Sequence, residues 1–184
     1  MRHLVCLLGV LFLFGASAKA QETPKVDVFA GYSYVRANPA TSGADGFNMH
    51  GGSASLAWNA KSWLGIVGEF GGYHSGEISG VSVDTNLYTY LFGPRVSYRK
   101  HDRFTPFGQI LFGGAHQTVS ALGASASQNS FAMSLGGGLD AKLSNRFSWR
   151  VGQVEYLMTR FPELTTSRET QNNTRISTGI VFHF

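Results

Sequence analysis

The chain has 184 residues, of which 43% are hydrophobic and only 14% are charged, with a formal net charge of +4. That length fits one domain, and the weak, scattered positive charge forms no stripe that could follow a nucleic-acid backbone. Cys6 is the single cysteine and lies near the start of the sequence. Nucleic-acid binding, disulfide bonds and cysteine-based catalysis are therefore not expected.

The first residues are typical of a secretory signal peptide. A basic start, Arg2-His3, precedes an apolar run at residues 4–14, and Ala18-Lys19-Ala20 supplies small residues for a cleavage point. The apolar run is too short to cross a bilayer as a stable helix. We expect residues 1–20 to be a signal peptide, with cleavage after Ala20 or Ala18, and residues 21–184 to form one exported β-barrel domain.

Beyond the leader, apolar and polar residues alternate over segments long enough to cross a bilayer as tilted strands. The last segment is the clearest, because one face carries Thr174, Ile176, Thr178, Ile180, Phe182 and Phe184. The other face is mostly polar or small, as suits a crowded barrel interior. The predicted strands are, in chain order, 25–36, 47–58, 63–73, 85–98, 104–116, 130–143, 147–160 and 174–184.

The predicted connections alternate between short and long. Short turns are predicted around residues 60, 101 and 145, and longer solvated loops at 37–46, 74–84, 117–129 and 161–173. Bacterial outer-membrane barrels have short periplasmic turns and longer external loops. The sequence therefore predicts an all-β, eight-stranded antiparallel up-and-down transmembrane β-barrel in the bacterial outer membrane.

Aromatic residues gather at the two predicted membrane interfaces, where they anchor transmembrane barrels. Those beside the short turns are Trp58, Trp63, Tyr98, Phe104, Phe147, Trp149 and Phe184. Those expected near the external rim are Tyr34, Tyr73, Tyr88, Phe131 and Tyr156. The alternative is a soluble β-barrel that uses these aromatics as its core.

Several stretches resemble the small outer-membrane β-barrel domain family related to the OmpA transmembrane domain. They are Phe92-Gly93-Pro94-Arg95 followed by Tyr98, Thr105-Pro106-Phe107 leading to Leu111-Phe112-Gly113-Gly114-Ala115, and Gly136-Gly137-Gly138-Leu139-Asp140. The resemblance implies an eight-stranded up-and-down barrel of the outer membrane, usually of unassigned activity. It also implies contact with outer-membrane lipid and lipopolysaccharide. The last strand, with Ile176, Thr178, Ile180, Phe182 and Phe184, is then the expected signal for the barrel-assembly machinery.

Charged and amide side chains on the predicted inward face indicate what fills the lumen. Strand parity directs Glu69, Arg95, Gln109, Asp140 and Arg175 inward. An eight-stranded barrel is just wide enough for its side chains to fill, so paired charges would plug it. The functional alternative is a narrow gated pore in which a pair such as Glu69–Arg95 exchanges partners.

The predicted strand at residues 147–160 is irregular, because Arg150 has one parity while Gln153 and Glu155 have the other. An arginine facing lipid near the middle of the membrane costs about 2–4 kcal/mol. A bulge near Gly152 would instead turn all three side chains into the lumen.

Catalysis is not expected from the sequence. His74, Ser75 and Glu77 supply the residue types of a lipid-modifying hydrolase, but adjacent strand residues point to opposite faces. The histidines have no metal-binding spacing, so we expect neither a metal nor a cofactor. The favoured function is a structural, envelope-stabilising or surface-interacting barrel. A narrow pore, a lipid-modifying enzyme and a soluble lipocalin-like binder are the alternatives.

Overall fold

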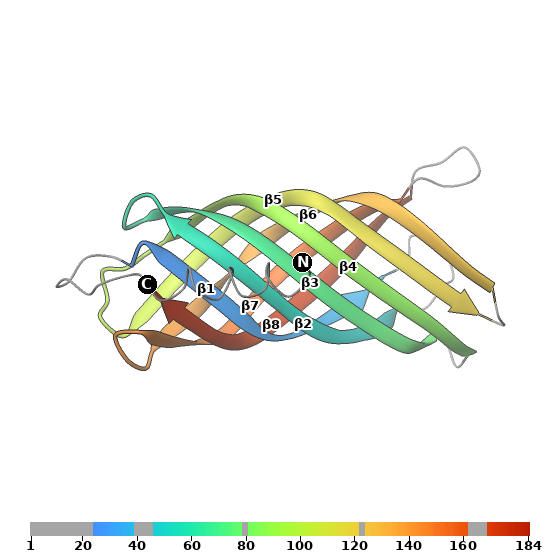
Figure 1. The fold of residues 1–184 in the computed structure, drawn as a ribbon, viewed down its shortest axis with the longest axis horizontal. Coiled ribbons are helices and arrows are strands. Elements are labelled where there is room, and N and C mark those ends of the chain that lie inside the picture. The colour runs from blue at the N-terminus through green and yellow to red at the C-terminus, as the bar shows by residue number, and fades with distance from the viewer. Residues whose placement is uncertain (1–23, 39–45, 79–80, 122–123, 162–168) are drawn as a thin grey trace, which may run out of the picture.

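The computed structural model describes residues 24–38, 46–78, 81–121, 124–161 and 169–184. These residues form eight strands, each antiparallel to its neighbours, and pairing of the first with the last closes the barrel (Figure 1). The strands are β1 Val26–Ala37, β2 Phe47–Asn59, β3 Leu64–Ile78, β4 Val81–Ser97, β5 Phe104–Ala121, β6 Ala124–Lys142, β7 Phe147–Phe161 and β8 Glu169–His183. The predicted fold class is confirmed. The expected signal peptide lies outside the described residues.

Side chains alternate between the outer surface and the lumen because strand geometry has a period of two. On β4, for example, Tyr88, Tyr90 and Phe92 point outward and are exposed, whereas Thr89 and Leu91 are buried. Closure gives every strand two hydrogen-bonded neighbours, which lets an apolar outer surface face lipid without a free sheet edge. Within the described ranges, no helix has the length and apolarity needed to span a bilayer.

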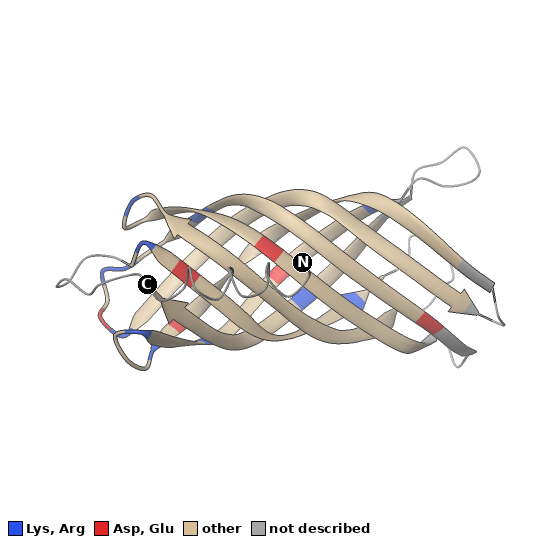
Figure 2. Cartoon of the chain, in the orientation of Figure 1, with Lys and Arg blue, Asp and Glu red and all other residues tan. Residues whose placement is uncertain are grey.

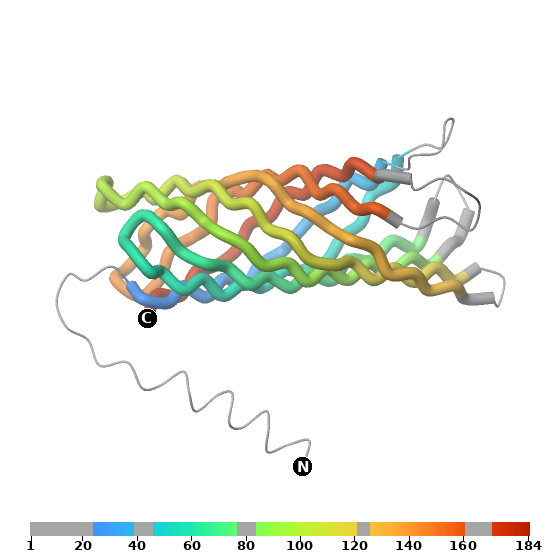
Figure 3. The backbone as a smooth tube through the Cα atoms, turned by 90° about the horizontal axis from the view of Figure 1, so that it is seen from above, coloured from blue at the N-terminus to red at the C-terminus, as the bar shows by residue number. Residues whose placement is uncertain are grey.

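The short connections lie together at one end of the barrel, which we call the turn end (Figure 3). They comprise residues 60–63, 98–103 and 143–146, and β1 begins and β8 ends there. Trp58, Trp63 and Trp149 are exposed on the outer surface near this end, as the girdle pattern predicts.

Two segments predicted as loops, 74–84 and 117–129, are instead mostly strand. They form the far ends of the β3–β4 and β5–β6 hairpins, where Val119, for example, pairs with Ala126. β8 likewise begins at Glu169, several residues before the predicted start. The apolar alternation marks only the part of a strand that faces lipid, whereas the backbone ladder needs no apolar face and continues beyond it.

Among the aromatics predicted near the external rim, Tyr73 is the one that does not face outward. Its side chain is 2% exposed and lies in the lumen, because it shares the parity of Glu69 rather than that of Phe70. The other four predicted rim aromatics point outward. Hydrophobicity alone therefore misplaced a residue that strand parity places correctly.

β7 contains the irregularity expected near Gly152. Asp140 of β6 pairs with Arg150, but the preceding Leu139 pairs with Gly152, so Val151 has no partner on β6. The pairing of β7 with β8 shifts at the same place. This bulge turns Arg150 and the residues of opposite parity that follow it toward the same interior.

The lumen is divided between apolar and polar contents. Its apolar cluster comprises Val35, Ala37, Met49, Ala57, Val67, Tyr73, Leu87, Leu91, Leu111, Ala115, Ala132 and Leu157. The interior is therefore less uniformly polar than strand parity suggested. The buried charged side chains come from β1, β3, β4, β6, β7 and β8.

The seam between β1 and β8 depends on a close approach of two glycines, Gly31 and Gly179, which are register partners. A Cβ atom at Gly31 would meet the carbonyl oxygen of Thr178 and would lie 2.9 Å from the Gly179 Cα. These are backbone atoms, so the clash could be relieved only by opening the seam.

We expect Gly31→Ala to lower the free energy of unfolding by about 1–3 kcal/mol, because it overpacks the seam. Gly152→Ala is the matched control, since no heavy atom lies within 4 Å of its Cβ position. That control should change stability by less than about 0.5 kcal/mol. Urea unfolding in detergent, followed by tryptophan fluorescence, measures both. Equal unfolding midpoints would contradict the proposed tightness of the seam.

Candidate functional site in the barrel lumen

Arg175 of β8 is fully buried and lies at the centre of a polar cluster that crosses the lumen. Its guanidinium donates to Glu69 of β3 and to Glu155 of β7, with Nε 2.8 Å from Glu155 Oε2. Its Nη1 donates to the Tyr73 hydroxyl oxygen at 2.8 Å. A charge removed from water needs several such partners, and here they come from opposite walls of the barrel.

Glu155 extends this cluster to two further strands. Gln109 Nε2 on β5 and Ser134 Oγ on β6 each donate to Glu155 Oε1 at 2.9 Å. Arg95 Nε on β4 donates in turn to Gln109 Oε1 at 2.9 Å. We call this connected set the Arg175 cluster; it comprises Glu69, Tyr73, Arg95, Gln109, Ser134, Glu155 and Arg175.

A second group surrounds Arg150 closer to the turn end. Arg150 donates two hydrogen bonds to Asp140, from Nε to Oδ1 at 2.8 Å and from Nη2 to Oδ2 at 3.1 Å. Its Nη1 donates to Gln153 Oε1 at 2.7 Å. The guanidinium carbon also lies 4.3 Å from the ring centre of Phe29 and 4.4 Å from that of Phe107. Bidentate pairing and cation–π contact together hold this charge in place.

The structure buries all eight predicted lumen side chains and distributes them over these two groups. The Arg175 cluster contains Glu69, Arg95, Gln109, Glu155 and Arg175, and the Arg150 group contains Asp140, Arg150 and Gln153.

The Glu69–Arg95 pair named in the pore alternative is not hydrogen-bonded in this structure. Glu69 bonds across the lumen to Arg175, and Arg95 bonds to Gln109, its register partner on the neighbouring strand. Among the described residues, Glu69 Oε2 and Arg95 Nη2 lack hydrogen-bond partners. Sequence parity identifies which residues enter the lumen, but not which of them meet there.

Phe29, Phe107 and Tyr73 contribute to the lumen without having been predicted to do so. Each ring folds over a glycine in its own or the neighbouring strand. A Cβ at Gly31 would lie 2.7 Å from the Phe29 ring, and one at Gly138 would lie 2.8 Å from the Phe107 ring. An aromatic residue of inward parity near an inward glycine was the available sequence signal.

His74 and Ser75, weighed above as hydrolase residues, lie on opposite faces of β3. His74 points outward and its Nδ1 lies 3.0 Å from Asn86 Oδ1, whereas Ser75 is buried on the opposite face. The Glu77 side chain lies outside the described part of the structure. Opposite strand faces separate His74 and Ser75, as the sequence argument anticipated.

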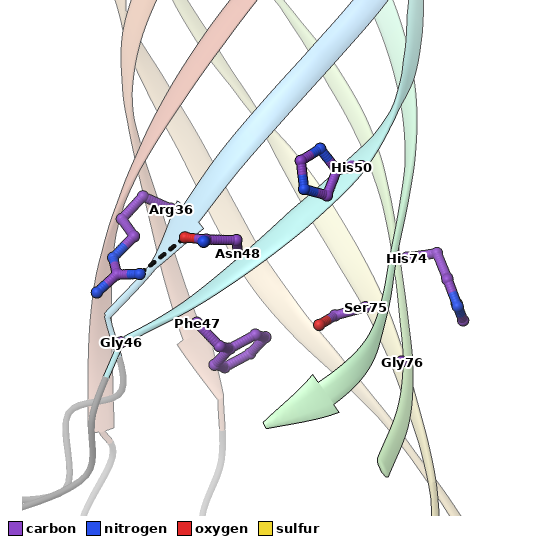
Figure 4. Close-up of a pocket in the computed structure, with 8 residues that line it drawn as sticks. All are labelled: Arg36, Gly46, Phe47, Asn48, His50, His74, Ser75 and Gly76. Atoms are coloured by element: carbon purple, nitrogen blue, oxygen red, sulfur yellow. Dashed lines mark hydrogen bonds between the residues drawn. The ribbon is translucent and has the colours of Figure 1, made fainter. Parts of the chain in front are cut away.

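A hollow of about 470 Å³ lies at the opposite end from the turns, beyond the last paired residues of β2 and β3 (Figure 4). Its lining residues are Arg36, Gly46, Phe47, Asn48, His50, His74, Ser75 and Gly76. Arg36 donates to Asn48, and His50 bonds to the Tyr32 hydroxyl on the outer surface. Figure 4 shows His74 directed away from Ser75.

The predicted assembly residues Ile176, Thr178, Ile180, Phe182 and Phe184 lie on the outer face of β8. Phe182 packs edge-on against Phe147 of β7, with ring centres 4.9 Å apart. Lys and Arg residues, by contrast, are concentrated at the turn end (Figure 2). The outer surface is therefore apolar along its length and basic at one end.

Comparisons with known proteins agree with this geometry. The family described as "Outer membrane protein beta-barrel domain" matches residues 6–184. Ail of Yersinia pestis, solved with the heparin analogue sucrose octasulfate, is similar at 17% identity and a TM-score of 0.61, covering 89% of this chain and 100% of Ail. No curated protein sequence matches the chain.

Two further solved structures share the fold. Neisserial surface protein A is 13% identical with a TM-score of 0.68, covering 87% of this chain and 97% of its own. The N-terminal β-barrel domain of Pseudomonas aeruginosa OprF is 14% identical with a TM-score of 0.55, and the match covers 89% of this chain and 100% of the OprF domain. At these identities the likeness concerns the fold alone.

Replacement of Arg175 tests the energetics of the lumen. Arg175→Met should lower the free energy of unfolding by about 3–5 kcal/mol, because it leaves two buried carboxylates without their cation. The control is Arg36→Met, where the exposed guanidinium donates to the Asn48 amide oxygen, with an expected change below about 0.5 kcal/mol. Urea unfolding in lipid vesicles compares them. Similar losses in both variants would show that the cluster is not a stabilising unit.

Proposed function

Because the chain belongs to the outer membrane protein β-barrel domain family, we propose that it is a structural barrel of the bacterial outer membrane with a closed lumen. In this role it stabilises the envelope, or it presents the end of the barrel opposite the turn end to surface partners. The turn end faces the periplasm, following the usual placement of short turns. Residues 1–20 act as the export signal.

The observation that carries this proposal is the full burial of Arg175 between Glu69 and Glu155. These side chains join β8 to β3 across the lumen and to β7 beside it. A barrel of this size has an interior that side chains can fill. Together with the Arg150 group and the apolar cluster, the Arg175 cluster leaves the interior occupied by protein and supports a plug.

Conductance measures closure directly. Purified barrels reconstituted into planar bilayers should give no stable conducting level at neutral pH, because the charged side chains bridge the lumen. Arg175→Ala should produce ion flux by removing the side chain that spans it. A wild-type barrel that conducts steadily would contradict the plug.

A narrow gated pore is a second candidate, favoured by one specific observation. Glu69 Oε2 and Arg95 Nη2 are buried without hydrogen-bond partners in the described structure. A buried polar atom without a hydrogen-bond partner is energetically costly. An alternative arrangement in which these two atoms bond each other would remove that cost. If Glu69 moved from Arg175 to Arg95, the bridge across the lumen would open. Wild-type channel openings whose frequency changes in Glu69→Gln, but not in Arg36→Met, would establish this pore.

The outer surface supports two further proposals about partners. Its apolar band contacts outer-membrane lipid, and its external end contacts lipopolysaccharide. The outward face of β8, ending in Phe182 and Phe184, is recognised by the barrel-assembly machinery. Both aromatic side chains are about two-fifths exposed and therefore available to a partner during assembly.

Phe184→Ala tests the assembly proposal. It should reduce the amount of folded protein in outer membranes several-fold while leaving refolding into detergent unchanged, because recognition and stability are separate properties. Phe104→Ala is the matched control, since Phe104 is also exposed on the outer surface at the turn end. Heat-dependent mobility on gels reports the folded fraction. Equal effects of the two variants in cells would remove the special role of Phe184.

A further inference from the structure

A continuous hydrogen-bonded chain links a serine, a histidine and an aspartate at the turn end of the lumen. Ser148 Oγ lies 2.7 Å from His183 Nε2, and His183 Nδ1 lies 2.7 Å from Asp27 Oδ1. The residues come from β7, β8 and β1, which barrel closure places side by side. They are far apart in sequence, so no local motif reveals them.

The other partners of Asp27 fix the direction of the hydrogen bonds. Arg99 Nη2 donates to Asp27 Oδ2 at 2.6 Å, and Asn59 Nδ2 donates to the same oxygen at 2.9 Å. These donors favour the ionised carboxylate, which can only accept from His183. The neutral imidazole then carries its proton on Nδ1, and Nε2 must accept the Ser148 hydroxyl proton. This is the proton arrangement of a serine nucleophile and its general base.

The location of the chain differs from that of the plug. Ser148 is 5% exposed and the His183 side chain is 11% exposed, whereas Arg150 and Arg175 are fully buried. The carboxylate of Asp27 already has a cation and an amide as partners, so its charge is compensated without Ser148. The serine therefore lies nearer the turn end than the fully buried arginines and retains slight exposure to solvent.

A cation stands opposite the serine. Lys142 of β6 is the register partner of Ser148, and directly opposed residues share one face with Cβ atoms about 4.5–5.5 Å apart. Lys142 is exposed to solvent. An electrophile held between these two side chains would place a developing negative charge beside the ammonium group.

We propose that Ser148 is the nucleophile of an esterase site at the turn end, acting on carboxylic esters that carry negative charge. His183 is its general base and Asp27 is a positioning residue that holds the imidazole tautomer. Lys142 stabilises the oxyanion. The surrounding lysines and arginines of the turn end favour an anionic substrate (Figure 2). This activity goes beyond the structural role and uses none of the Arg175 cluster.

The reaction is a hydrolysis and needs no redox partner. Ser148 Oγ forms a bond to the ester carbonyl carbon while its proton passes to His183 Nε2. The bond from the carbonyl carbon to the alcohol oxygen then breaks, and the alcohol leaves with that proton. Water attacks the acyl-serine, gives a proton to His183, and releases the carboxylic acid as Ser148 recovers its hydroxyl proton.

The first test uses wild-type protein folded in detergent and a fluorophosphonate probe, with peptide mass spectrometry to locate the label. We expect label on Ser148 and none on Ser33, a buried lumen serine that bonds Ser53 and Ser177 at 2.7 Å rather than an imidazole. His183→Gln should slow labelling by about 100-fold. Folded wild-type protein without label on Ser148 would overturn the proposal, as would equal labelling of Ser33.

The second test concerns the substrate class. Hydrolysis of para-nitrophenyl succinate, which has a free carboxylate, should exceed that of the uncharged acetate ester. Lys142→Ala should lower kcat by about 100-fold, and Lys142→Arg should restore part of it. Ser33→Ala should leave both rates unchanged, while Ser148→Ala should abolish them. Turnover that persists in Ser148→Ala would overturn the proposal.

Discussion

The requirement that a closed barrel satisfy its own polar groups governs this structure. Lipid offers no hydrogen bonds to the backbone, so each strand must have two neighbours, and the seam between β1 and β8 must close. The same requirement applies inside, where Arg150 and Arg175 are completely removed from solvent. Burying these two guanidinium groups in a closed barrel therefore requires their carboxylate and amide partners.

Closure also brings together residues that no single strand could hold. The seam packs Gly31 against Gly179 in the middle of the barrel and, at its turn end, places His183 beside Asp27. The proposed plug and the proposed esterase site thus depend on one ring of strands but occupy different levels of it. A substitution in the Arg175 cluster should leave the reactivity of Ser148 largely unchanged, because the two sites share no hydrogen bond in the described structure.

Much of the fold and part of the lumen could be predicted from local pattern. Alternation placed the strands, and strand parity directed Glu69, Gln109 and Asp140 inward because adjacent side chains must take opposite faces. Even the β7 bulge followed from the conflicting parity of Arg150 and Glu155. The hairpin ends were missed because strands outside lipid carry no apolar signal, and Tyr73 was missed because its hydrophobicity outweighed its parity.

The sequence by itself determined the barrel, its approximate strands and the side chains that enter the lumen, since these depend on a period of two and on apolar surface. Tertiary structure alone decided the partners: Arg175 rather than Arg95 for Glu69, and His183 for both Ser148 and Asp27. Those choices depend on the stagger of every strand around the ring and on which side chains reach across it. No local sequence pattern specifies the combined stagger of all eight strands.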